Sequence, residues 1–206
     1  MPTIMTTLTR RCARMAILAS LLLLAAEVVE SVFVDTAALS VTPSERIAAT
    51  LFFTGAIALT IGLVGIYLHQ VEAAGRFGTI AFLVALVGSA LMISSDWNQL
   101  FAGPTLLQIP NIATDFPPLM IAGFLMNYGC YLLGWMLFGL ATYRARVFPR
   151  AAGLLLIVSI LLSLTRIPGI FALFYATIGW LGILTLRPGT AEVVAADARS
   201  LYSRSA

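Results

Sequence analysis

Long apolar runs separated by short polar segments fill most of the chain. The hydrocarbon core of a membrane is about 30 Å thick, and a helix needs about 20 apolar residues to cross it. By that measure the pattern predicts six membrane-spanning helices, at residues 13–34, 47–69, 77–100, 119–143, 151–166 and 168–186. We therefore expect an all-α protein with one six-helix transmembrane domain over residues 1–187, followed by a short cytoplasmic tail over residues 188–206.

Composition supports the membrane interpretation. Of the 206 residues, 60% are hydrophobic and 10% are charged, whereas soluble domains carry about 25% charged residues. The net charge is +3, but a nucleic-acid-binding protein gathers its basic residues on one face or stripe. Here they are scattered through short segments between the apolar runs, so we expect membrane lipid as the surroundings and no nucleic-acid partner.

The arginines predict how the helices are oriented. Cytoplasmic loops of membrane proteins carry an excess of basic residues. In the six-helix arrangement, ten of the twelve basic residues fall on one side, and only Arg46 and Arg166 fall on the other. We therefore expect both termini in the cytoplasm and a multi-pass protein of the bacterial inner membrane. The first apolar run is interpreted as a retained helix; its removal as a secretory signal peptide is the open alternative.

Polar residues gather at the end of the third apolar run, in the stretch "DWNQ" that begins at Asp96. Gly78, Ala85, Ser89 and Asp96 are spaced by 7, 4 and 7 residues, which keeps them near one face of a helix that turns about 100° per residue. Small residues of this kind line contacts between membrane helices. Asp96 is therefore expected to face the bundle interior, as one wall of an outward-facing polar pocket. Alternatively, these residues are wetted at the membrane surface, with Trp97 in the aromatic belt.

Further polar residues at similar depth complete a candidate polar cluster. Charged side chains inside a membrane are costly and usually face a bundle interior or a cavity. Glu27 lies on a small-residue face of the first run, where it is either a hydrogen-bonded structural acid or a functional group. Asn127 lies at a comparable depth in the fourth run, on a face with Gly123, Cys130 and Gly134 that is likewise expected to be buried against other helices. Arg166 is the expected counter-charge for the acids. The predicted cluster comprises Glu27, Glu30, Asp96, Asn127 and Arg166.

Residues typical of metal, haem or nucleophilic sites are scarce. His69 is the only histidine, and no second histidine or cysteine stands at ligand spacing, so no zinc or haem site is expected. Any serine-histidine-acid set would depend on this one residue, and the sequence has no glycine-rich phosphate loop. Cys12 and Cys130 are expected to be free thiols. We therefore assign no catalytic, cofactor-binding or metal-binding residue and expect no cofactor.

One part of the chain resembles a known family. The run "VEAAGRFGTIAFLVALVGSAL", an outer "DW" and then "LGWMLFGLATYRARVFPRAAGLLLI" lie within residues 65–162. This pattern is similar to that of a family of small six-span bacterial integral membrane proteins of unknown function. The matching residues mostly set membrane topology. The resemblance therefore implies a six-helix fold and carries over no activity and no functional residue.

Three functional hypotheses follow from these patterns. The leading one is a non-enzymatic binding, carrier or accessory module whose outward-facing polar cluster meets a lipid-soluble small molecule or a partner membrane protein. The second is a membrane-embedded enzyme that uses Glu27 or Asp96 as acid or base on a lipid-soluble substrate. The third is a structural subunit of a larger membrane complex. An acid used for binding or catalysis should border a cavity, whereas a structural acid should be paired and packed, and a subunit should carry small residues on an outer helix face.

Overall fold

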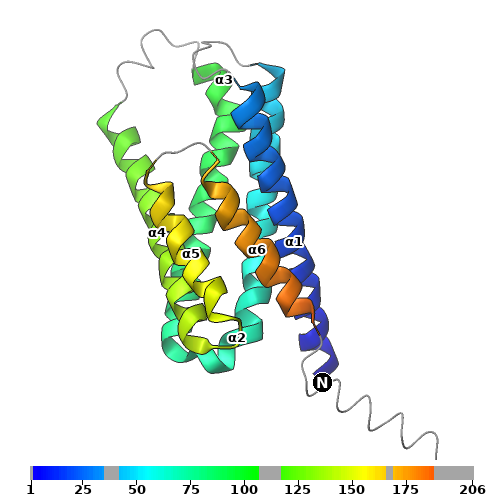
Figure 1. Cartoon of the computed structure of the whole chain (residues 1–206). Helices are drawn as coiled ribbons and strands as arrows, with labels where there is room; N and C mark the ends of the chain where they lie inside the picture. The colour runs from blue at the N-terminus through cyan, green and yellow to red at the C-terminus, as the bar shows by residue number, and fades with distance from the viewer. Residues whose placement is uncertain (1, 35–41, 107–116, 166–168, 188–206) are drawn as a thin grey trace, which may run out of the picture.

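The protein is a bundle of long helices in a computed structural model that describes residues 2–34, 42–106, 117–165 and 169–187 (Figure 1). The described residues contain helices and turns and no strand, which confirms the all-α prediction. The helices are α1 (Pro2–Phe33), α2 (Pro43–Trp97), the π-helix η1 (Asn98–Ala102), α3 (Gly103–Leu106), α4 (Pro118–Ala145), α5 (Arg150–Ser163) and α6 (Phe171–Leu186). The predicted tail, residues 188–206, lies outside the described residues.

Helix α2 is a hairpin of two antiparallel arms. Gly75 has φ 58° and ψ −157°, a combination that is essentially restricted to glycine. The chain turns back there, as Figure 1 shows. The Tyr67 hydroxyl and Thr79 Oγ1, one on each arm, lie 3.0 Å apart in a hydrogen bond, and the Tyr67 ring stacks on Phe82 at 4.0 Å. The predicted helices at 47–69 and 77–100 correspond to these arms.

Local signals explain where the helices begin and end. Thr42 and Glu45 form a capping box at the start of α2: each side chain bonds the other residue's backbone N–H, and Pro43 follows the cap. At the end of α4, Arg146 adopts a left-handed conformation with φ 56°. Pro149 then stands at the N-cap of α5. A short connection thus reverses the chain between α4 and α5.

Close helix crossings depend on small residues. A Cβ atom on Gly62 would lie 2.6 Å from Ala16 Cα, and one on Gly134 would lie 2.6 Å from Ala85 Cα. These sites join α2 to α1 and to α4, where only a residue without a side chain permits such an approach. The expected burial of Ala85 and Gly134 is therefore confirmed. For Gly123 it is wrong, because α4 stands clear of its neighbours near its first turns and this glycine is exposed.

The outward faces of the bundle are aliphatic, and its centre is aromatic. Within the described residues, three helices are long and apolar enough to cross a membrane: Met5–Phe33, Pro43–Ala102 and Pro118–Ala145. Large exposed side chains, among them Leu21, Ile61 and Leu83, cover their outer surfaces, while Trp135 and Phe138 are fully buried. An exposed aliphatic surface around a packed interior is the arrangement expected of a protein surrounded by lipid.

Two helices of the bundle, α5 and α6, are shorter than α1, α2 and α4. Helix α5 has 14 residues and α6 has 16, which at 1.5 Å per residue corresponds to about 21 and 24 Å. Figure 1 shows their upper ends well below the upper ends of α1 and α2. The space above α6 is therefore bordered by the longer helices.

Candidate functional site

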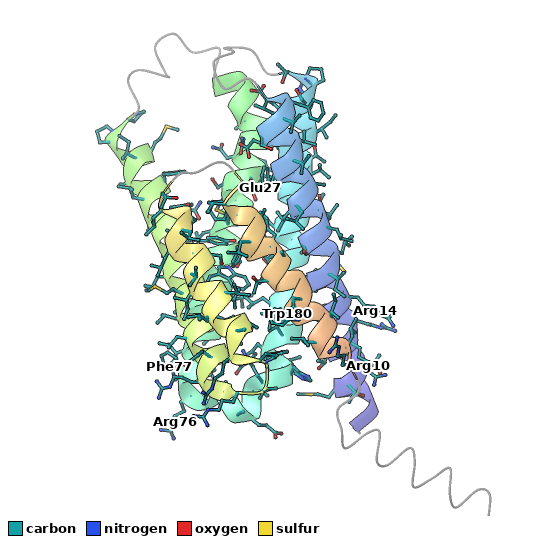
Figure 2. The ribbon with its side chains drawn as sticks, viewed as in Figure 1. Arg10, Arg14, Glu27, Arg76, Phe77 and Trp180 are labelled. Atoms are coloured by element: carbon teal, nitrogen blue, oxygen red, sulfur yellow. The ribbon has the colours of Figure 1, made fainter. Side chains whose placement is uncertain are left out.

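Basic and acidic side chains lie at opposite ends of the bundle. Arg10, Arg14 and Arg76 are near the lower end in Figure 2, while Glu27 is in the upper part. The lower end also carries two cation-π contacts: Arg144 Cζ lies 5.3 Å from the ring centre of Phe77, and Arg150 Cζ lies 6.0 Å from that of Tyr143. We call the lower end the arginine end and the upper end, with Glu27, Glu30 and Asp96, the acidic end.

A cavity of about 200 Å³ lies at the acidic end. Side chains from α1, both arms of α2, η1, α4 and α6 border it, above the start of the short helix α6. We call it the acidic cavity. Its polar lining residues are Glu27, Glu30, Ser89, Asp96, Gln99, Tyr128, Tyr131 and Tyr175.

The stretch from Asp96 to Gln99 divides between two sides of its helix. Asp96 is buried, with 9% of its surface exposed, and borders the acidic cavity together with Gln99. Trp97 and Asn98 are exposed and border a different groove. A helical turn of about 100° per residue explains the split, since residues three apart return to nearly the same face. Asp96 and Gln99 therefore fit the interpretation as a pocket wall, whereas Trp97 and Asn98 fit the interpretation as membrane-surface residues.

The three carboxylates of the acidic cavity face it from two helices. Glu27 and Glu30 are three residues apart on α1, and Asp96 is on the second arm of α2. Within the part of the chain that the structure describes, no side chain donates a hydrogen bond to them or forms an ion pair with them. Tyr175 borders the same cavity. A purely structural acid would have hydrogen-bond or ion-pair partners at this depth.

Two buried tyrosines add unpaired hydroxyl groups to the acidic cavity. Tyr131 has 4% of its surface exposed and Tyr175 has 8%, and both border the cavity. Neither hydroxyl has a hydrogen-bond partner among the described residues, although buried tyrosines usually find one. The sequence analysis missed both residues. The signal was a tyrosine inside an apolar run with another aromatic residue three or four positions away on the same face, Tyr128 and Phe171.

Packed aromatic rings close the acidic cavity toward the bundle centre. The indole Nε1 of Trp135 donates a hydrogen bond of 3.1 Å to Ser89 Oγ on the cavity wall. The Phe174 ring lies 4.9 Å from the Trp135 ring and 6.1 Å from the Tyr131 ring, both nearly edge to face. Because Trp135 and Phe174 are fully buried, these rings form a solid floor below the polar lining.

The predicted polar cluster is only partly assembled. Glu27, Glu30 and Asp96 border the same cavity. Asn127 does not; it borders a groove between the second arm of α2 and α4, with its Oδ1 buried and unpaired among the described residues. It precedes Tyr128 by one position and is therefore rotated by about 100° from the cavity wall. Arg166 lies outside the described residues, so its pairing with the acids stays a prediction.

Other potentially reactive residues lie away from the acidic cavity. His69 is near the arginine end, where its ring lies 5.2 Å from that of Phe148. Cys12 and Cys130 are free thiols, as predicted. The described residues contain no group of three or more histidines, cysteines, aspartates or glutamates that could hold a metal ion.

The fold and the cavity together define a class of protein: an all-α bundle with apolar helices long enough to cross a membrane and an acid-lined cavity near one end. Compared with family models, curated proteins and solved structures, the chain matches none of them. The resemblance to small six-span bacterial membrane proteins therefore stays a prediction.

Proposed function

We propose that this protein crosses the bacterial inner membrane six times, with both termini in the cytoplasm, and that it binds or carries a small molecule in the acidic cavity without changing it chemically. The observation that carries the proposal is the cavity itself. Its acids are the buried Asp96, the half-buried Glu27 and the exposed Glu30, and neither they nor the Tyr131 and Tyr175 hydroxyls have a partner among the described residues. Polar groups are costly to bury without partners. A ligand that supplies those partners would be held by the same groups.

The distribution of arginines supports the orientation. Arg10 of α1 and Arg187 at the end of α6 border one groove at the arginine end. Arg76 lies at the same end, in the turn of the α2 hairpin. Basic residues favour the cytoplasmic side, so the acidic cavity would lie in the outer half of the membrane, accessible from outside.

The outward faces of α1 and α2 favour binding over a structural role in a larger complex. A subunit held in a larger complex should present small residues outward. Here large aliphatic side chains such as Leu21, Ile61 and Leu83 cover the outward faces of α1 and α2. The glycines where these helices meet, Gly55, Gly62 and Gly65, are buried.

Cysteine labelling tests the orientation. In a variant carrying Cys12→Ser and Cys130→Ser, a single cysteine is introduced either as Gln99→Cys at the acidic end or as Glu72→Cys at the arginine end. Both native positions are exposed. A membrane-impermeant maleimide should label the first in intact spheroplasts and the second only after permeabilisation. The reverse pattern would contradict the proposed orientation.

Ligand retention tests the binding function. Purified protein is equilibrated by dialysis against a small-molecule extract of the producing bacterium, and bound compounds are identified by mass spectrometry. The matched variant is Ala56→Phe, which places a ring in the cavity because Ala56 is a buried lining residue. A compound that is enriched by the native protein, lost in the variant and recovered unchanged supports the proposal. A new product that requires Glu27 or Asp96 would replace it with the enzyme hypothesis.

A further inference from the structure

We propose that the ligand of the acidic cavity is a protonated organic amine, with an ammonium group held by Asp96, Glu27 and the tyrosine hydroxyls and a small apolar body held by the aromatic walls. This inference rests on the proposed function and adds the chemical class of the ligand.

The charge of the cavity lining favours a cationic ligand. Three carboxylates line it, and no described arginine does. Arg46, the one described arginine outside the arginine end, is exposed and does not border the cavity. Carboxylates form their strongest hydrogen bonds with charged N–H donors. Among the described residues no charged N–H donor reaches them, and a cationic ligand would supply one.

The spacing of the carboxylates favours an organic cation over a metal ion. The described acids form no group of three that could hold a metal. Calcium requires about six to eight oxygen ligands within about 2.6 Å of one point. Here the acidic groups are instead distributed around a cavity that also exposes apolar and aromatic side chains. A ligand that reaches several walls at once therefore fits better than a single ion.

The size and the walls define the apolar part of the ligand. Leu23, Phe52, Leu59 and Phe171 supply apolar surface around the cavity of about 200 Å³. A cavity of about 150 Å³ holds benzene in another protein, so this one suits a body of about that size with a short polar extension. Aromatic walls also attract cations through their ring faces.

The unpaired acceptors match the donors of an ammonium group. A primary ammonium carries three N–H donors and no acceptor, like the lysine side chain. Asp96 and the hydroxyls of Tyr131 and Tyr175 are acceptors on residues more than nine-tenths buried, and none has a partner among the described residues. All three residues border the acidic cavity, so an ammonium group bound there would donate to acceptors for which no described residue supplies a donor.

A pair of nearly isosteric probes tests the ligand class. Benzylamine is protonated at neutral pH, and benzyl alcohol is its neutral counterpart of almost equal size. Each is titrated into the full-length protein in mild detergent, with binding measured by calorimetry and by the shift in melting temperature. We expect benzylamine to bind and to raise the melting temperature, and benzyl alcohol to bind at least about tenfold more weakly, since it lacks the charge-assisted hydrogen bonds.

Matched variants locate the site. Asp96→Asn and Glu27→Gln should each weaken benzylamine at least about tenfold, the loss expected for one charge-assisted hydrogen bond. Glu72→Gln makes the same chemical change at the arginine end, on an exposed side chain outside the acidic cavity, and should leave the affinity unchanged. If either Asp96→Asn or Glu27→Gln fails to fold, the other variant still tests whether the acidic cavity binds benzylamine.

Four results would overturn the amine inference. Equal affinities for benzylamine and benzyl alcohol would mean that the charge of the acidic cavity is not recognised. The same would follow if Glu72→Gln weakened benzylamine binding as much as the two cavity variants do. Failure of both probes to bind would also overturn it. The inference would also fail if Arg166→Ala bound benzylamine and the native protein did not. In that case the Arg166 guanidinium would pair with the carboxylates in the native protein and occupy the place assigned to the ligand. The proposed binding function fails separately, when Ala56→Phe retains the same compounds from the extract as the native protein.

Discussion

The indole Nε1 of Trp135 donates a hydrogen bond of 3.1 Å to Ser89 Oγ, and both residues are almost completely buried. Trp135 is on α4 and Ser89 on the second arm of α2. The bond joins these helices directly below the acidic cavity, because Ser89 belongs to the cavity wall and Trp135 to the aromatic floor. The position of the cavity wall therefore depends on a polar contact inside the core.

Removing the acceptor of this bond should destabilise the protein. Ser89→Ala leaves the buried indole N–H without a partner, which costs about 1–3 kcal/mol of unfolding free energy. Unfolding in detergent micelles measures the loss. Ser94→Ala, an exposed serine on the same helix, should change the unfolding free energy little. In Trp135→Phe, Ser89→Ala should cost less than in the native background; an equal cost in both would show that the bond does not contribute.

The crossing of α2 and α4 gives a second prediction. Gly134→Ala places a methyl group 2.6 Å from Ala85 Cα, so the backbones must separate, at a cost of about 1–3 kcal/mol. Gly123→Ala, on the same helix, meets no atom within 4 Å and should be neutral or slightly stabilising, because alanine favours helix. Melting temperatures in detergent distinguish the two. Equal effects would mean that close approach is not what makes Gly134 necessary.

Sequence periodicity was sufficient to predict an all-α chain and to place Asp96 on a buried helix face. The stripe of Gly78, Ala85, Ser89 and Asp96 is buried, because a helical repeat fixes which residues share a face. The same argument failed at Gly123, since sharing a face does not ensure that a neighbouring helix is present beside it. The periodicity of a sequence shows which residues share a face of one helix. Whether that face is buried depends on how close the neighbouring helix lies at that position.

The cavity could not be predicted from the sequence, because periodicity does not show where each helix ends relative to its neighbours. It exists because α6 begins only at Phe171, below the ends of the longer helices, and helix ends in apolar runs are weakly marked in sequence. Tyr131 and Tyr175 have the spacing of ordinary core aromatics. Only their packing shows that the hydroxyls face a polar space. Asn127 and Glu27 were matched by depth alone, and depth does not determine the direction in which each side chain points.

The turn of the α2 hairpin gives a third prediction. Gly75→Ala introduces a Cβ atom at φ 58° and ψ −157°, while no atom lies within 4 Å to clash with it. Any loss is therefore backbone strain, about 1–3 kcal/mol for such a conformation. Gly129→Ala is the control, since this helical glycine also faces open space but has no positive φ. An unchanged melting temperature in Gly75→Ala would mean that the turn adopts another conformation.

The last prediction concerns a buried polar pair near the arginine end. Gln70 Nε2 donates a hydrogen bond of 3.0 Å to Thr142 Oγ1, joining the first arm of α2 to α4, and both residues are 1% exposed. Gln70 Oε1 already lacks a partner among the described residues. Thr142→Val removes the acceptor and leaves the whole amide unpaired, at a cost of about 1–3 kcal/mol. Replacing both residues, with Gln70→Leu and Thr142→Val, removes every unpaired group and should recover most of that loss. The test is to measure the unfolding free energies of Gln70→Leu, Thr142→Val and the double variant. If the double variant loses as much unfolding free energy as the two single variants together, the Gln70 amide has another partner and the explanation by unpaired groups is wrong at this position.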